Sequence, residues 1–201
     1  MSYVFINNST LFLIFVNDIF NCVNNLDVVL YADDATFVFK HKNIDTIFNV
    51  VNNELSNISQ WASSNRLLVN IRKTKYMLIN NCKKIDIGNN TLSMNNVVIE
   101  NVKSFKFLGI IIDDRFSFKE HISYIENKVS KSIGIIKRFH FLPSNVLRNL
   151  YFSIIHSYLS YGNVIWGSTA PSNLMSLSLL NKKNYKTHNW EQLVIHNPTF
   201  V

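Results

Sequence analysis

Two different periods of apolar residues run along the first third of the chain. Residues 43–63 carry apolar side chains three or four positions apart, which predicts an amphipathic helix packed on a sheet. Before it, two β-prone runs within 27–39 flank the adjacent Asp33 and Asp34, which predicts a hairpin with both carboxylates near its tip. An apolar helix over 9–20 is predicted to precede the hairpin.

The following residues predict short strands joined by turns. One strand is predicted over 75–80, and one or two more over 104–113. Asn-Asn pairs at 89–90 and 95–96 are typical of turns, because asparagine tolerates turn backbone conformations.

The last part of the pattern is helical. Apolar residues again recur at threes and fours after Ser117 or Phe118, which predicts a long helix beginning there. Three basic residues project from the opposite side of this helix: Lys128, Lys131 and Arg138. Ser144 is a candidate cap for a further helix to about residue 158. The order of elements predicts an α+β half followed by an α half, with a boundary near 115.

Composition supports a packed protein with an anionic partner. Apolar residues make up 47% of the chain and charged residues only 16%, which favours a globular chain over a disordered one. The formal net charge of +7 weakly indicates a polyanionic partner.

The cellular setting is predicted to be intracellular, nuclear or cytoplasmic, and not secreted. Cys22 and Cys82 form no Cys-x-x-Cys pattern, so a reduced protein without structural zinc is the simplest interpretation. The apolar stretch 11–16 is too short to span a bilayer, and Asp18 follows it closely. No membrane partner is therefore expected, although an anchor over 11–20 remains an alternative.

The sequence Tyr31-Ala32-Asp33-Asp34 carries the most informative chemistry. Successive side chains of a strand point to opposite faces, so both acids can bind one ion only where a turn reorients them. At a hairpin tip two such carboxylates repel each other, and a hard cation such as Mg²⁺ relieves the repulsion. An Asp-Asp turn without a ligand is the simpler alternative for the motif in isolation.

Five segments together resemble the reverse transcriptases of non-LTR (LINE, jockey-like) retrotransposons. They occur in the family's order, with comparable spacing, over about residues 9–183. The segments are the helix 11–19, the loop Leu30-Tyr31-Ala32-Asp33-Asp34-Ala35-Thr36, the pattern of Trp61, Asn65, Leu67, Asn70, Lys73 and Thr74, the run 105–113, and Tyr161-Gly162-Asn163-Val164-Ile165-Trp166-Gly167.

The resemblance implies a two-ion site for nucleotidyl transfer. Asp33 would be the principal Mg²⁺ ligand, Asp34 its less critical neighbour, and Tyr31 would flank the site near the primer end. Lys73 would protonate the leaving pyrophosphate, although a phosphate-binding or solvated lysine is an equal alternative. The implied partners are an RNA template, a DNA primer and deoxynucleoside triphosphates.

The resemblance also implies nucleic-acid contacts further along the chain. Phe107, Leu108 and Gly109 would hold the primer strand, where a buried strand with a turn is the alternative. Lys128, Lys131 and Arg138 would contact duplex phosphates, where a solvated helix face is equally plausible.

The implied fold is α+β: a partial polymerase palm, with an antiparallel sheet and packing helices, followed by an α-helical thumb. The expected domains are 1–115 for the palm, 116–183 for the thumb and 184–201 for a divergent tail.

Residues 1–8 contain no counterpart of the family's upstream metal-binding aspartate, so the two-ion site is expected to be incomplete. We therefore expect a fragment that is inactive alone and depends on the missing N-terminal palm and fingers. A non-catalytic nucleic-acid-binding remnant of a mobile element is the alternative.

Overall fold

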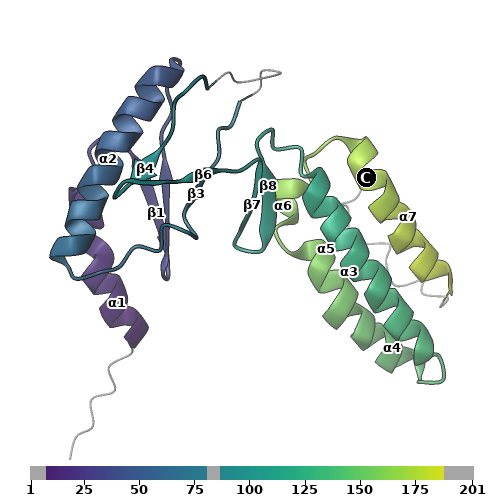
Figure 1. Ribbon diagram of the computed structural model, residues 1–201. Helices are drawn as coiled ribbons and strands as arrows, with labels where there is room; N and C mark the ends of the chain where they lie inside the picture. The colour runs from purple at the N-terminus through teal and green to yellow at the C-terminus, as the bar shows by residue number, and fades with distance from the viewer. Residues whose placement is uncertain (1–7, 81–86, 188–201) are drawn as a thin grey trace, which may run out of the picture. The chain divides into compact units, whose positions relative to one another are not determined.

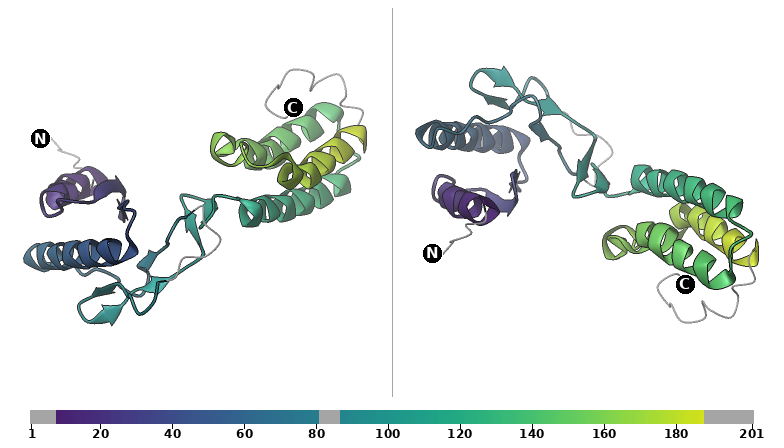
Figure 2. Two further views of the ribbon diagram at one scale, coloured as in Figure 1. Left: turned by 90° about the horizontal axis from the view of Figure 1, so that it is seen from above. Right: turned by 90° about the horizontal axis from the view of Figure 1, so that it is seen from below.

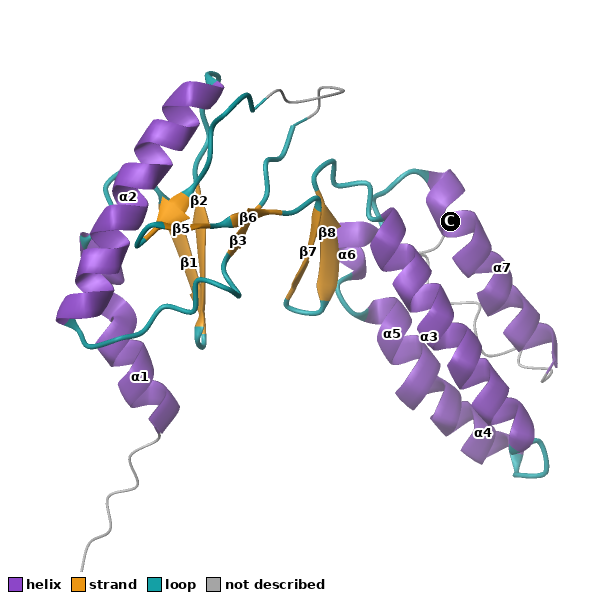
Figure 3. Ribbon diagram, viewed as in Figure 1, coloured by secondary structure: helices purple, strands orange, loops and turns teal. Residues whose placement is uncertain are grey.

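The computed structural model describes residues 8–80 and 87–187 of the chain. They belong to two compact units (Figure 1). The first unit comprises Met1–Tyr76 and Cys82–Val102, and the second comprises Met77–Asn81 and Lys103–Val201. Helices and small sheets occur together (Figure 3), which is compatible with the predicted α+β class. Within the described ranges, no helix has the length and apolar character needed to cross a membrane.

Two helical segments and a hairpin begin the first unit. The α-helix α1 (Asn8–Val16) continues as a 3₁₀ helix, η1 (Asn17–Asn21), which agrees with the predicted helix over 9–20. The antiparallel strands β1 (Asp27–Tyr31) and β2 (Asp34–Val38) form the predicted hairpin. Tyr31 lies opposite Asp34 in the ladder, so the loop consists of Ala32 and Asp33.

The long helix of the first unit is α2 (Ile44–Ser64), which confirms the prediction over 43–63. The Asn43 side chain caps it by accepting a hydrogen bond from the Thr46 backbone N–H at 3.1 Å. Its apolar stripe is buried, with Phe48 and Ile58 at 2% and 4% exposure. The apolar face predicted from the 3.6-residue period is therefore the face that packs inward.

Short strand pairs complete the first unit. The strands β3 (Lys75–Tyr76) and β6 (Glu100–Asn101) are parallel, and β4 (Ser93–Met94) and β5 (Val97–Val98) are antiparallel. The strand predicted over 75–80 is therefore shorter than expected, because its ladder with β6 covers only Lys75 and Tyr76, whereas the Asn80 N–H donates to the Asp114 carbonyl at 3.3 Å. The Asn95–Asn96 turn is confirmed, with φ of 52° and 62°. The other turn lies one residue earlier than predicted, at Gly88–Asn89.

Side-chain amides and a buried carboxylate tie these segments to α2. The Asn52 Nδ2 donates to the Thr91 carbonyl at 2.9 Å, and its Oδ1 accepts from the Ser93 N–H at 3.0 Å. Glu54, only 2% exposed, accepts hydrogen bonds from Asn24, Asn25 and Asn57. Burial raises the pKa of Glu54, but these hydrogen bonds outweigh it and hold the pKa below its ordinary value.

The second unit combines one hairpin with a set of packed helices (Figure 2). The hairpin strands are β7 (Ser104–Phe107) and β8 (Ile110–Asp113), and they are antiparallel. The helices are α3 (Lys119–Arg138), α4 (Ser144–Leu150), the π-helix η2 (Tyr151–His156), α5 (Ser157–Ser160), α6 (Asn163–Trp166) and α7 (Pro171–Thr187). Val129, Ile155 and Trp166 are fully buried in its core.

The helix predicted over 144–158 is present, with two differences. Its cap is Pro143, and Ser144 is the first helical residue, so the predicted capping role of Ser144 is wrong. Pro143 has φ of −54° and ψ of 146°, the non-helical backbone typical of a residue that precedes the first turn. The middle of the run is also π-helical rather than α-helical, which periodicity alone does not distinguish.

Candidate active site

The tip of the β1–β2 hairpin presents two adjacent carboxylates to solvent. Asp33 occupies the second position of the two-residue loop, and Asp34 begins β2. Ala32, the first loop residue, has a φ of 51°, in the left-handed region that residues with a Cβ seldom adopt. This loop takes Asp33 out of the strand alternation, as expected from the sequence.

Both aspartates and Tyr31 are exposed to solvent, and the exposed fraction of Tyr31 is 60%. Because Tyr31 pairs directly with Asp34, the two side chains share one face of the hairpin. Within the described ranges, no group of three or more acidic, histidine or cysteine residues is arranged to hold a metal ion. The tip of the hairpin therefore presents two adjacent carboxylates, Asp33 and Asp34.

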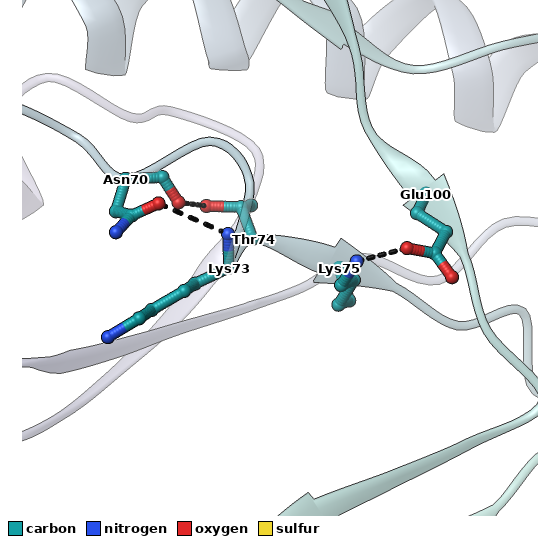
Figure 4. Close-up of polar contacts among 5 residues, drawn as sticks. All are labelled: Asn70, Lys73, Thr74, Lys75 and Glu100. Atoms are coloured by element: carbon teal, nitrogen blue, oxygen red, sulfur yellow. Dashed lines mark hydrogen bonds and ion pairs between the residues drawn. The ribbon is translucent and has the colours of Figure 1, made fainter.

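Lys73 belongs to a turn closed by Asn70 (Figure 4). The Lys73 N–H donates to the Asn70 carbonyl at 3.0 Å and to its side-chain oxygen at 3.3 Å. The Thr74 hydroxyl donates to the same carbonyl at 3.1 Å. The Lys73 ammonium extends away from this turn, and the residue is exposed. Lys75, two residues after Lys73, forms an ion pair with Glu100 across β3 and β6.

In the second unit, Leu108 and Gly109 form the two-residue loop between β7 and β8. Their φ values are 45° and 87°, as in the I′ turns whose twist matches that of the flanking strands. The Tyr161 hydroxyl donates a 2.6 Å hydrogen bond to the Leu108 carbonyl. A Cβ on Gly109 would lie 3.2 Å from the Tyr161 ring, so any larger residue there would make a tight contact with the ring.

The segment beneath this loop is fixed by a tryptophan. Trp166 is 0% exposed, and its Nε1 donates to the Tyr161 carbonyl at 2.9 Å. Gly162 has a φ of 62°, and a Cβ there would meet the Ile110 side chain at 2.5 Å. Residues 161–167 therefore support the loop that the sequence singled out as primer-holding. Their resemblance to the family was visible in the sequence, but contact with a loop 53 residues earlier was not.

His121 joins β8 to α3 from the interior. The Ile111 N–H donates to its Nδ1 at 3.3 Å, and the ring meets Trp166 edge-on at 5.8 Å. His121 is 2% exposed, and its Nε2 has no hydrogen-bond partner among the described residues. Burial lowers the pKa of His121, and the positive charge of Lys106 lowers it further.

Asp113 links the end of β8 to the start of α3. Its carboxylate accepts hydrogen bonds from the N–H groups of Arg115, Ser117 and Phe118 and from the Ser117 hydroxyl. Burial raises the pKa of Asp113, but these donors outweigh it and hold the pKa below its ordinary value. The acid ending the run 105–113 therefore has a structural role, which the sequence did not reveal.

The basic residues predicted to contact nucleic acid lie on the solvent side of α3. Lys128, Lys131 and Arg138 are exposed, whereas Val129 and Ile136 of the apolar stripe are buried. The candidate residues thus fall into two sets, one in each compact unit. Tyr31, Asp33, Asp34 and Lys73 belong to the first unit, and Phe107, Leu108, Gly109 and the three basic residues belong to the second.

Comparison with known proteins identifies the family. Residues 5–112 match the family model described as reverse transcriptase (RNA-dependent DNA polymerase). The chain belongs to the reverse transcriptase family. This confirms the resemblance inferred from the hairpin and its neighbouring motifs. No solved structure gives a significant match.

The reverse transcriptase relatives include proteins of non-LTR mobile elements. The chain is 27% identical over 175 residues to the "RNA-directed DNA polymerase from mobile element jockey" of Drosophila melanogaster. The aligned region covers 82% of this chain and 18% of the relative. It is 22% identical over 120 residues to the "Retrovirus-related Pol polyprotein from type-1 retrotransposable element R1 2" of Nasonia vitripennis, covering 57% of this chain and 29% of the relative. The chain thus spans under a third of the length of each.

Proposed function

We propose that this reverse transcriptase chain supplies the metal-binding hairpin and the primer-holding surface for RNA-templated DNA synthesis. The observation that carries the proposal is the β1–β2 loop, which places Asp33 and Asp34 together, exposed, in a chain of this family. The first unit would then be part of a polymerase palm, and the α-helices of the second would belong to the thumb.

The donor chemistry of the hairpin tip suits Mg²⁺. Carboxylate oxygens are the ligands that this hard cation prefers, and both acids are accessible to solvent. Asp33 would be the principal ligand and Asp34 the supporting one. When bound, a pair of Mg²⁺ ions would neutralise charge developing on the reacting phosphate oxygens. Two adjacent carboxylates do not make a complete two-ion site, so the remaining ligands would come from outside the described residues.

The other candidate residues would orient the nucleic acid and the incoming deoxynucleoside triphosphate. Tyr31 shares a face with Asp34 and would lie beside the primer end. Lys73 would donate a proton to pyrophosphate or bind its charge, with the Asn70 turn holding its backbone. Leu108 and Gly109 would contact the primer strand through their backbone, because Gly109 presents no side chain there. Lys128, Lys131 and Arg138 would contact duplex phosphates without reading sequence.

Metal binding at the hairpin provides the direct test. Mn²⁺, used as a paramagnetic substitute for Mg²⁺, should bind the full chain weakly and broaden NMR signals around the tip. Asp33→Asn should abolish this broadening because it removes the principal charged ligand. Asp27→Asn is a matched control, since Asp27 is an exposed acid at the opposite end of the same hairpin. Equal broadening in the wild type and in Asp33→Asn would refute the assignment.

Primer extension tests the catalytic part of the proposal. Asp33 and Asp34 alone do not make a complete two-ion site, so the reacting groups would not be held in position. Misplacement of a reacting group by about 1 Å can already reduce a rate around a hundredfold. The 201-residue chain alone should therefore show no extension on an RNA template. Fusing the upstream palm strands of a related polymerase ahead of Met1 should give extension, and Asp33→Ala should abolish it. Extension by the unfused chain that is lost in Asp33→Ala would show that these residues suffice.

A non-catalytic nucleic-acid-binding role is the second candidate. It is favoured by the exposed basic residues on α3, which need no metal to contact phosphates. Salt-dependent duplex binding by the chain, with no extension even in the fused form, would favour this role over catalysis.

A further inference from the structure

Two lysine ammonium groups in the second unit lie against one aromatic ring. The Nζ of Lys106, on β7, is 5.1 Å from the centroid of the Tyr124 ring. The Nζ of Lys128, on α3, is 5.6 Å from the same centroid. Both distances fall within the range of about 6 Å at which an aromatic ring attracts a cation. The Tyr124 ring is thus contacted by two positive charges, one from the hairpin and one from the helix.

The ring is held in place from the interior. His121, one helical turn earlier, is buried and lies nearly parallel to Tyr124, with ring centroids 6.3 Å apart and an angle of 20°. Lys106 pairs with Ile111 across the hairpin, so both side chains share one face. A shallow surface hollow adjoins this face, and its lining residues are Ile111, Lys119, Glu120, Ser123, Tyr124 and Asn127.

Neither lysine is neutralised within the described part of the chain. The ion pair found there joins Lys75 to Glu100, in the first unit. Glu120 is the one acid lining the hollow, and it forms no ion pair with Lys106 or Lys128. Both lysines are exposed, and like charges drawn to one ring repel each other. An anion bound between or beside them would relieve that repulsion.

We propose that Lys106, Tyr124 and Lys128 form a binding site for the sugar–phosphate backbone of a nucleic acid. This inference rests on the proposed function, and it assigns a specific phosphate contact to the junction of β7 and α3. The two ammonium groups come from separate elements on an open surface, which suits successive phosphates of a strand better than one enclosed anion. Lysine is apt here because it contacts phosphate as a point charge without demanding one geometry.

The salt dependence of duplex binding tests this site. A labelled RNA–DNA duplex is titrated with the full chain at several KCl concentrations. Replacing both Lys106 and Lys128 with alanine should reduce the slope of log K against log [KCl] by about two, one for each lost phosphate contact. Lys103→Ala with Lys137→Ala is the matched control, because it removes two exposed lysines of the same unit that do not contact the ring. This control should change the slope by less than one.

Two substitutions of the ring separate its role from that of charge alone. Tyr124→Phe keeps an aromatic ring and should retain wild-type affinity within about twofold. Tyr124→Leu keeps an apolar side chain without π-electrons, and should weaken binding several-fold with the net charge unchanged. Glu120→Gln should tighten binding, because it removes the acid lining the hollow.

Three outcomes would overturn the proposal. The first is an equal loss of slope in both double-lysine variants, which would indicate a diffuse basic surface. The second is competition by inorganic phosphate at a concentration comparable to that of duplex phosphate, which would indicate a small-anion site. The third is an absence of duplex binding by the wild type. Failure here leaves the Mn²⁺ result at Asp33 unaffected, so it is distinguishable from failure of the proposed function.

Discussion

At the scale of single residues, the β7–β8 loop depends on the absence of a side chain at Gly109. Its φ of 87° is strained for any residue with a Cβ, and that atom would lie in tight contact with the Tyr161 ring, at 3.2 Å. The Tyr161 hydroxyl then bonds the neighbouring carbonyl of Leu108, so one aromatic residue fixes both loop residues. The loop is held by packing and a hydrogen bond as well as by strand pairing.

Gly109→Ala should therefore destabilise the second unit. Strain at a positive φ is of the order of 1–2 kcal/mol for an L-residue, and displacement of the Tyr161 ring adds to it. Gly134→Ala is the matched control, because Gly134 lies within α3 and an added Cβ there meets nothing within 4 Å. That control should stabilise the helix by about 0.5–1 kcal/mol. Urea denaturation followed by circular dichroism measures the change in unfolding free energy of both variants. A Gly109→Ala variant that is no less stable than Gly134→Ala would contradict the role given to Tyr161.

His121 gives the second unit a predicted dependence on pH. Its lowered pKa means that the folded state keeps the imidazole neutral, whereas the unfolded chain takes up a proton below about 6.5. Stability should therefore be fully present above that pH and decline as the pH falls below it. Protonation would also place a hydrogen on Nδ1, which accepts the Ile111 N–H, close to the charge of Lys106.

Thermal melts between pH 8 and pH 5.5 check this expectation. His121→Gln should flatten the decline, because a neutral amide can accept the Ile111 hydrogen bond without titrating. His140→Gln, at an exposed histidine after the end of α3, should leave the decline unchanged. A decline of the same size in His121→Gln would show that another group is responsible.

At the scale of elements, the sequence predicted what periodicity and turn chemistry determine. The spacing of apolar residues predicted α2 nearly to its ends and the start of α3 to within two residues, and the Asp33-Asp34 pair predicted the tip of the β1–β2 hairpin. The roles of the candidate site residues in metal and nucleic-acid binding remain predictions.

The remaining elements depend on contacts that a local pattern does not contain. The strand predicted over 75–80 forms a ladder only at its start, because its ladder partners are Glu100 and Asn101, 25 residues later. The start of α3 follows a residue of positive φ, Phe118, and the carboxylate of Asp113 makes that turn possible. The Tyr161–Leu108 bond likewise joins residues that are distant in sequence.

At the scale of the molecule, each compact unit has its own buried side chains. Phe48 and Ile58 belong to the first unit, and Ile155 and Trp166 to the second. The residues that would bind metal and those that would hold the primer are therefore stabilised by different sets of contacts. Damage to one core should leave the packing of the other largely intact.

Ile155→Ala tests this independence. Ile155 is fully buried, so its truncation should destabilise the second unit by about 2–5 kcal/mol. Hydrogen exchange of backbone amides should then accelerate in α3 and α5 while protection in α2 stays close to that of the wild type. Phe48→Ala is the reciprocal variant, since Phe48 is 2% exposed on α2. Parallel acceleration in both units from either change would indicate a single cooperative structure.

The carboxylate of Asp113 also determines where the chain can be divided for crystallisation or expression of shorter pieces. A fragment beginning at residue 116 would include all of α3 but would lack the acceptor for the Ser117 and Phe118 N–H groups. It would also lack β8, whose Ile110 is part of the core beneath α3. Fragment boundaries should therefore fall before Lys103, where the second unit resumes, and the hairpin should be kept with the helices that follow it.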